Sequence, residues 1–319
     1  YAAGRFSTIG GGFQNQATGG YSFVGGGNLI CATACLAAAV GGSNNRASGL
    51  RSFVGGGSAN TASGYISVVV GGDSNIANTT YATIGGGSNH LASGNNSTIA
   101  GGNSNSASGN CSVIAGGNSN TSSGACSTLG GGASNSASGV RSFIGGGGSN
   151  TASGYSSVVS GGGSNTADST YSTVGGGANN TALYAYATVS GGYNNCACGY
   201  MSTVGGGCIN CAFATSSGTF SGRYNSVSGN YGFVGGGFNN KNFGYASTIS
   251  GGYKNCTNGN DVTVGGGICN MACNSTNGCN VSGATIAGGV GNNTSGGSWL
   301  AAGYFGVSPT ARSEEHTSE

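Results

Sequence analysis

The chain has 319 residues, of which 72 are glycine and only 4% are charged, and its formal net charge is +2. So few charged side chains exclude a charge-driven disordered tail and a nucleic-acid-binding surface, on which Lys and Arg would have to cluster. No run of apolar residues approaches the roughly 18 needed for a membrane-spanning helix. A composition this rich in glycine indicates disorder unless the glycines follow a period.

The glycines do follow a period, in a phrase of fifteen residues that reads V-G-G-G-x-S-N-x-A-S-G-x-x-S-T. With position 1 at Ile9, steps of fifteen reach Val264 and give 18 consecutive repeats. Position 4 is glycine in all 18, position 3 is glycine except at Ser221, and position 1 is Val, Ile or Leu except at Ala39 and Thr219. A fixed period without insertions predicts that each repeat closes one coil of a solenoid.

Each coil is predicted to hold two short strands, around positions 1 and 9, where the sequence reads S-T-V-G-G and N-x-A-S-G. Alternate strand residues share a face, so position 1 points inward with positions 14 and 3, and position 9 with positions 7 and 11. These small side chains leave a narrow interior. The sequence therefore predicts an all-β fold, a parallel β-solenoid of about 18 coils of 15 residues with two short strands per coil.

Position 7 is asparagine in every repeat except two, where Ile30 and His90 stand instead. We expect these side chains to point inward and stack, each side-chain N–H donating to the amide oxygen of the next coil, because an unpaired buried amide costs about 1–3 kcal/mol. The alternative is that asparagine simply favours the turn. The predicted structural ladder consists of Asn45, Asn60, Asn75, Asn105, Asn120, Asn135, Asn150, Asn165, Asn180, Asn195, Asn210, Asn225, Asn240, Asn255 and Asn270.

The repeat also predicts the domain organisation. We expect the β-solenoid repeat domain over residues 1–278 and irregular C-terminal coils over 279–310, because the phrase restarts seven residues late at Ile286. A loop is expected around Cys279, with order decaying after Thr263. Residues 311–319 break the repeat and look like a translated sequencing adapter, so they are expected not to be native. Because Tyr1 falls in mid-repeat, the chain is expected to be a fragment in which no signal peptide or anchor is visible.

Catalytic chemistry has little support in this sequence. Asp73, Asp168 and Asp261 fall at different repeat positions, so they neither pair for acid–base catalysis nor stack as a calcium-binding column. His90 replaces one ladder asparagine and is interpreted as a structural substitution rather than a ligand or base. We expect no enzyme activity, no cofactor and no catalytic or metal site.

The twelve cysteines leave three interpretations open. Cys111 and Cys126 share position 13 on neighbouring coils, and Cys196 and Cys211 share position 8, so each pair is a candidate disulfide in an oxidising compartment, although side-by-side parallel positions suit the S–S torsion poorly. The second interpretation is a zinc site from four sulfurs within sixteen residues, Cys196, Cys198, Cys208 and Cys211. In the third interpretation, cysteine is simply a small residue that replaces Ser or Thr.

The run from Ala152 to Gly161, A-S-G-Y-S-S-V-V-S-G, resembles the A-x-G-x-x-S-x-A-x-G repeat of the YadA-like heads of trimeric autotransporter adhesins. The resemblance covers residues 1 to about 278. It implies a left-handed β-roll, a homotrimer of chains side by side, and an extracellular or cell-surface location where the head binds extracellular matrix or another surface ligand. Similar glycine-rich repeats in viral and phage fibres make a fibre shaft an alternative.

A thin interior favours association, since one Val and one Ala per coil form a small core. Outward aromatic residues are candidates for an interface between copies or for adhesion, at position 15 in Phe23, Phe53 and Phe143 and at position 13 in Tyr81, Tyr171 and Tyr186. A further alternative is ice binding through an outward Thr-x-Ser row at positions 8 and 10. The position-8 threonines are Thr61, Thr121, Thr151, Thr166 and Thr181.

Overall fold

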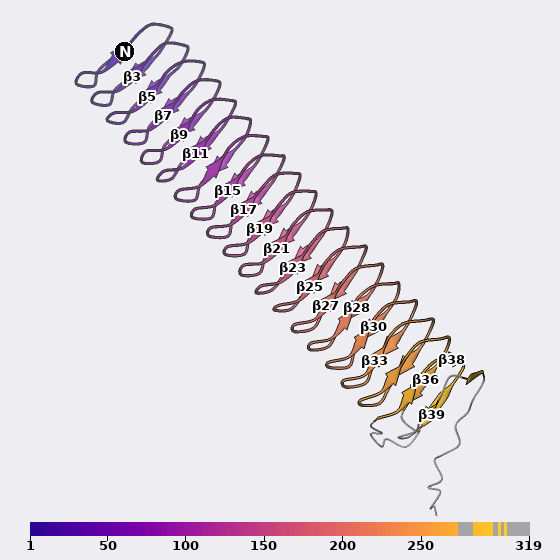
Figure 1. Cartoon of the computed structure of the whole chain (residues 1–319). Helices are drawn as coiled ribbons and strands as arrows, with labels where there is room; N and C mark the ends of the chain where they lie inside the picture. Colours follow the sequence, from indigo (N-terminus) through magenta and orange to yellow (C-terminus); the bar gives the residue numbers. More distant parts are fainter. Residues whose placement is uncertain (274–282, 296–298, 301–302, 305–319) are drawn as a thin grey trace, which may run out of the picture. The chain divides into compact units, whose positions relative to one another are not determined.

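The computed structural model describes residues 1–273, 283–295, 299–300 and 303–304, and its regular elements are short parallel strands (Figure 1). It is a parallel β-solenoid of about 18 coils with two short strands per coil, which confirms the predicted fold class. None of the described residues is helical. The chain divides into two compact units, Tyr1–Ser164 and Asn165–Glu319, each of which is built from stacked coils.

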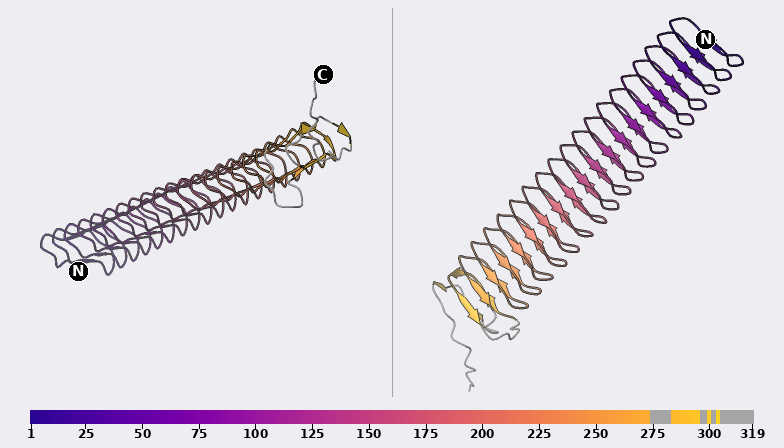
Figure 2. Two further views of the ribbon diagram at one scale, coloured as in Figure 1. Left: turned by 90° about the horizontal axis from the view of Figure 1, so that it is seen from below. Right: turned by 180° about the vertical axis from the view of Figure 1, so that it is seen from behind.

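Two parallel sheets build the first unit, and the further views in Figure 2 show their strands from other sides. Sheet 1 joins positions 15 and 1 of successive coils, and sheet 2 joins positions 8 and 9. The sheet 1 strands are β1 (Thr8–Ile9), β3 (Phe23–Val24), β5 (Ala38–Ala39), β7 (Phe53–Val54), β9 (Val68–Val69), β11 (Thr83–Ile84), β13 (Thr98–Ile99), β15 (Val113–Ile114), β17 (Thr128–Leu129), β19 (Phe143–Ile144) and β21 (Val158–Val159). The sheet 2 strands are β2 (Gln16–Ala17), β4 (Cys31–Ala32), β6 (Arg46–Ala47), β8 (Thr61–Ala62), β10 (Ile76–Ala77), β12 (Leu91–Ala92), β14 (Ser106–Ala107), β16 (Thr121–Ser122), β18 (Ser136–Ala137) and β20 (Thr151–Ala152).

The second unit repeats this arrangement. Its sheet 1 strands are β23 (Thr173–Val174), β25 (Thr188–Val189), β27 (Thr203–Val204), β29 (Gly218–Thr219), β31 (Phe233–Val234), β33 (Thr248–Ile249), β35 (Thr263–Val264), β37 (Thr285–Ile286) and β40 (Trp299–Leu300). Its sheet 2 strands are β22 (Thr166–Ala167), β24 (Thr181–Ala182), β26 (Cys196–Ala197), β28 (Cys211–Ala212), β30 (Ser226–Val227), β32 (Lys241–Asn242), β34 (Cys256–Thr257), β36 (Met271–Cys273) and β39 (Asn293–Ser295). A separate pair is formed by β38 (Gly289–Val290) and β41 (Gly303–Tyr304).

The register between coils is fifteen residues. In sheet 1, Thr83 pairs with Thr98 and Ile84 with Ile99. The backbone N–H of Thr83 donates to the Ser97 carbonyl at 2.9 Å, and equivalent bonds join one coil to the next throughout each unit. Equivalent residues therefore lie in columns along the stack, as a period without insertions requires.

The columns at positions 1, 7, 9 and 14 form the interior. The position-1 side chains from Val24 to Val264 and the position-9 alanines are fully buried, and the position-14 serines are at most 2% exposed. This confirms the predicted inward faces at positions 1, 7, 9 and 14. Position 11 is buried in the coils where it is glycine, but Tyr184 at that position is 51% exposed. Glycine at position 3 is only half-buried in most coils, as at Gly41, because the chain has left the strand there and started to turn.

Two corners close each coil, and each contains a non-glycine residue with positive φ. These residues occupy positions 6 and 13, with φ between 49° and 61°. The left-handed region costs a residue with a Cβ about 1–3 kcal/mol. The strained N–H donates backward to the preceding coil, from Tyr81 to the Tyr65 carbonyl and from Ala59 to the Ser43 carbonyl, each at 2.9 Å. Hydrogen bonds between coils thus hold both corners in their strained form.

Glycine is invariant at position 4 for a steric reason. Its φ lies between 83° and 100° in every coil, a region that other residues rarely adopt. A Cβ on Gly57 would overlap the Gly72 carbonyl oxygen and would lie 2.8 Å from Nδ2 of Asn60. The turn before the asparagine column therefore admits no side chain.

The C-terminal coil keeps the register of the repeats despite seven extra residues. Ile286 pairs with Val264 in sheet 1, and Asn292 lies on Asn270 in the ladder. The expectation that order decays after Thr263 is therefore wrong for residues 283–295, because the restarted phrase places the same residue types at the same columns. The loop expected around Cys279, the boundary at 278/279 and residues 311–319 lie outside the described residues. The handedness of the coil stays a prediction.

Candidate functional surfaces

The predicted ladder residues, from Asn45 to Asn270, are at most 1% exposed, so asparagine at position 7 does point inward. Asn60 shows how each one is bonded. Its Oδ1 accepts the Asn75 backbone N–H at 3.0 Å, and its Nδ2 donates to the Gly56 carbonyl at 2.9 Å and the Gly72 carbonyl at 2.8 Å. One side chain therefore fixes its own turn and also joins two coils.

The expected bond from amide to amide is wrong for most of the ladder. A contact between amides does occur at Asn240, whose Nδ2 lies 3.2 Å from the preceding amide oxygen, that of Asn225. The backbone N–H at position 7 of the next coil lies directly over Oδ1, while Nδ2 faces turn carbonyls that need a donor. Both interpretations of asparagine thus hold together, since each residue is a ladder rung and also a turn residue.

His90 takes over part of the asparagine function. The His90 Nδ1 accepts the Asn105 backbone N–H at 3.1 Å, in the place of the usual amide oxygen. The backbone N–H of His90 donates to Asn75 Oδ1 at 3.0 Å. Burial lowers the pKa of His90 below 6.5 and outweighs an opposing backbone contact with Gly102. Because protonation at Nδ1 would remove the acceptor for Asn105, the neutral imidazole is the form that fits. His90 is therefore a rung of the ladder.

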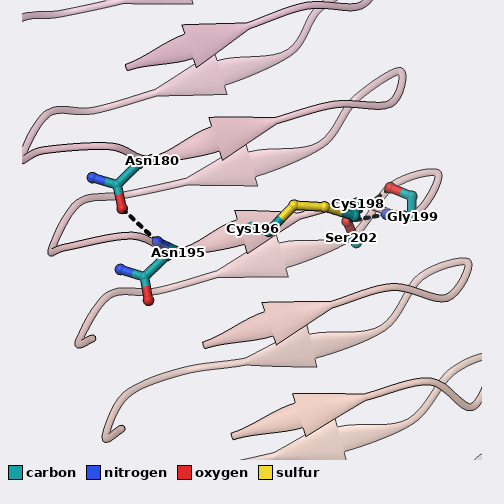
Figure 3. The surroundings of a disulfide bond; sticks show 6 residues. All are labelled: Asn180, Asn195, Cys196, Cys198, Gly199 and Ser202. Carbon is teal, nitrogen blue, oxygen red and sulfur yellow. Dashed lines mark hydrogen bonds between the residues drawn. A yellow bond between two sulfur atoms is a disulfide. The ribbon is translucent and has the colours of Figure 1, made fainter. Parts of the chain in front are cut away.

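The cysteines pair differently from the prediction (Figure 3). Cys196, in β26, is bonded to Cys198, the residue that directly follows this strand, whereas Cys111, Cys126 and Cys211 are free thiols. Cys196 and Cys198 are both half-buried on either side of the buried Ala197, and their Cα atoms lie 5.5 Å apart, within the range of a disulfide. In-register neighbours on parallel strands instead point their Cα–Cβ bonds the same way. The two predicted disulfides between coils are therefore wrong.

The other groups with potential chemistry stay apart. Among the described residues no three His, Cys, Asp or Glu side chains are close enough to hold a metal ion, and two of the four proposed zinc sulfurs are joined as a disulfide. Burial raises the pKa of the Cys211 thiol, which a backbone hydrogen bond involving Cys196 partly opposes. This thiol is thus less easily ionised than an exposed one.

The outer face of sheet 2 carries the predicted threonine row. Its members Thr61, Thr121, Thr151, Thr166 and Thr181 are half-buried. Thr166 pairs with Thr181, but Arg46 and Ile76 flank Thr61 on the two neighbouring coils. The row is therefore continuous only over short stretches.

Sequence reasoning missed a second threonine row, on sheet 1. At position 15, Thr173 pairs with Thr188, which pairs in turn with Thr203. The residue two places later on the same face is small in these coils, Gly175 or Ser190 for example. The signal was present in the phrase, whose fifteenth letter is threonine.

Exposed aromatic side chains gather at the corner around positions 12 and 13. Tyr171 and Tyr186 are 47% and 48% exposed, and their rings stack at 5.3 Å with an angle of 22° between them. Tyr186 also meets Tyr200 edge to face at 5.9 Å. These three residues form the tyrosine corner of the second unit.

The opposite corner, around positions 5 and 6, carries aromatic rings beside cations. Phe238 and Tyr253 stack at 5.4 Å with an angle of 9°. The Arg223 guanidinium lies 4.7 Å from the Tyr224 ring centre, and Lys254 Nζ lies 5.0 Å from that of Tyr253. Two of the few positive charges are thus held against ring faces at this corner.

Phenylalanine at position 15 of sheet 1 is 43% exposed in Phe23, 36% in Phe53 and 41% in Phe143. Each ring lies beside the glycine two residues later: a Cβ on Gly55 would lie 3.2 Å from the Phe53 ring. The ring covers backbone that glycine leaves bare, so part of its apolar surface is already used within the chain.

No protein-family model matches the chain, and a search of curated proteins finds no significant match. Within the described part of the chain, no helix is long and apolar enough to cross a membrane.

Proposed function

We propose that this chain is a non-enzymatic surface or fibre protein, similar to a trimeric autotransporter adhesin head, that makes attachments through the outer rows of its solenoid. Support comes mainly from one observation, the tyrosine corner, in which Tyr171, Tyr186 and Tyr200 present exposed rings on successive coils. Exposed aromatic residues are enriched where proteins bind other surfaces. Such a role implies an extracellular or cell-surface location.

The proposal includes a homo-oligomer, a trimer by the resemblance. The interior of each coil holds little apolar surface beyond one aliphatic side chain and one alanine, as Val69 and Ala77 illustrate. The half-exposed rings of Phe23, Phe53 and Phe143 on the flat outer face of sheet 1 offer further apolar area to a second copy. Association would then be linked to folding, so dilution should lower stability.

Adhesion by coated beads tests this function. Beads carrying the purified chain are expected to attach to extracellular-matrix proteins such as collagen or fibronectin, and the double substitution Tyr171→Ser and Tyr186→Ser should abolish attachment. The matched control is Thr173→Ser on sheet 1 of the same unit, which should leave attachment unchanged. Sedimentation velocity should show an oligomer. A chain that sediments as a monomer and attaches to none of these surfaces contradicts the proposal.

Ice binding is kept as a second candidate because sheet 1 carries the threonine run Thr173, Thr188 and Thr203. This run is as long as the three successive threonines of the predicted sheet 2 row, Thr151, Thr166 and Thr181. A flat sheet with aligned hydroxyls is the feature that such a function needs. Thr188→Lys should then abolish ice shaping in a nanolitre osmometer while the circular dichroism spectrum stays the same. A viral or phage fibre shaft is a third candidate, which differs from the first in how the solenoid is displayed.

A further inference from the structure

One coil of the second unit departs from the repeat at four successive positions. It carries Gly218 at position 15, Thr219 at position 1, Phe220 at position 2 and Ser221 at position 3, where the phrase has T-V-G-G. In the 18 repeats no other coil has an aromatic residue at position 2, and glycine recurs at position 15 only at Gly278, in the last repeat. Each of the four positions carries a residue type that differs from the phrase, so this coil is a candidate for a local function.

The change produces a depression of about 240 Å³ on the outer face of sheet 1. At Gly218 the column of position-15 side chains has a gap, bordered by Thr203 on the preceding coil and Phe233 on the next. Phe220 and Met201 form further parts of the wall. Gly218 itself is buried, because a Cβ there would lie only 3.8 Å from the Phe233 ring and 4.0 Å from the Phe220 ring. The depression therefore lies beside a position that has no side chain.

The wall combines ring faces with hydroxyl groups. Phe220 is 54% exposed, and its ring meets that of Phe233 at 5.3 Å with an angle of 56°, so the two rings do not cover each other's faces. Thr203, Ser216 and Tyr231 bring hydroxyls to the same depression. No charged residue lines it, so its chemistry selects a neutral ligand.

We propose that this depression binds one neutral pyranose ring of an oligosaccharide. A pyranose has an apolar face of C–H groups that packs on aromatic rings and a rim of hydroxyls that exchange hydrogen bonds with Ser, Thr and Tyr. The volume is below that of sites for drug-sized ligands, which are roughly 300–1,000 Å³, and so fits a single ring. The inference rests on the proposed attachment function and deepens it, because it names the class of ligand.

Gly218→Thr is the sharpest test because it restores the phrase. The backbone of Gly218 lies in strand β29, and a Cβ there meets the Thr203 carbonyl oxygen at 3.7 Å and the Phe233 ring at 3.8 Å, which are ordinary contacts. The variant should fold at least as well as the original chain, since threonine favours strands. Its side chain fills the gap and should abolish binding.

Binding is measured by saturation-transfer NMR on the full chain with three probes: lactose, cellobiose and N,N′-diacetylchitobiose. We expect at least one to bind in the millimolar range, as a single ring in a shallow site does. Gly218→Thr and Phe220→Ser should each weaken binding at least tenfold; serine already stands at position 2 in Ser190 and Ser250. Thr173→Val, in the same row but away from the depression, should not.

Three results overturn the proposal: no transfer to any of the disaccharides, binding that survives Gly218→Thr, or binding at this depression of the tripeptide Gly-Tyr-Gly instead, which would indicate a protein partner. The active disaccharide coupled to albumin on beads distinguishes surface-linked glycans from free sugar. If the disaccharides fail while coated beads still attach through Tyr171 and Tyr186, this inference fails and the attachment function stands.

Discussion

Replacing Asn60 by leucine tests whether the asparagine column holds the coils together. Leucine has nearly the same branched shape, but it can neither donate nor accept. The Asn75 backbone N–H loses its acceptor at 3.0 Å, and the Gly56 carbonyl loses its donor at 2.9 Å. The Gly72 carbonyl keeps a partner, because it also accepts the Ser58 N–H at 2.9 Å.

The expected loss follows from these two backbone groups. Each buried polar group left without a partner costs about 1–3 kcal/mol, and burial of the leucine side chain returns about 1–2 kcal/mol. The middle of these ranges gives a net loss in the free energy of unfolding of about 2–3 kcal/mol. The neighbouring substitution Thr61→Leu changes an outward side chain on the same coil and should cost less than about 1 kcal/mol.

Urea unfolding of the full chain, followed by far-UV circular dichroism, measures both variants. The midpoint should fall clearly for Asn60→Leu and little for Thr61→Leu, with similar slopes if unfolding remains cooperative. Equal shifts for the two variants would refute the assignment of inner and outer faces. An unchanged midpoint for Asn60→Leu would refute the structural importance of the ladder.

Four further outcomes are expected. Ile30→Asn should raise the free energy of unfolding by about 1–2 kcal/mol in urea titration, because it restores a rung that isoleucine cannot form; a loss would contradict the ladder. Stability should fall as pH drops below 6.5, because the folded pKa of His90 is lowered and only the unfolded chain takes up the proton in that range. His90→Asn should remove this fall, and a pH profile that the substitution leaves unchanged would contradict the assignment to His90. Ile66→Asn should raise the free energy of unfolding by about 1 kcal/mol, and with it the melting temperature, because Ile66 has a φ of 52° that asparagine tolerates better. Peptide mass spectrometry after alkylation should show Cys196 and Cys198 unlabelled and lighter by two hydrogens, and labels on both would contradict their pairing.

The repeat alone was enough to predict the architecture, the inner columns and the buried asparagines. A strict fifteen-residue period permits only coils of equal length, and period-two alternation around positions 1 and 9 then assigns Val and Ala to the inside. The late restart at Ile286 could also be read from the phrase, and the structure places Ile286 on Val264. These features depend on local residue type and spacing, which a sequence contains in full.

Contacts between coils decided the rest. Whether Asn60 bonds to an amide or to a backbone N–H depends on the exact offset of neighbouring coils, and whether Cys196 pairs along or across strands depends on the direction of its Cα–Cβ bond. The depression at Gly218 arises only because Thr203 and Phe233, fifteen residues away on either side, stand beside the gap. Such features belong to atoms that are distant in sequence, so only the stacked structure shows them.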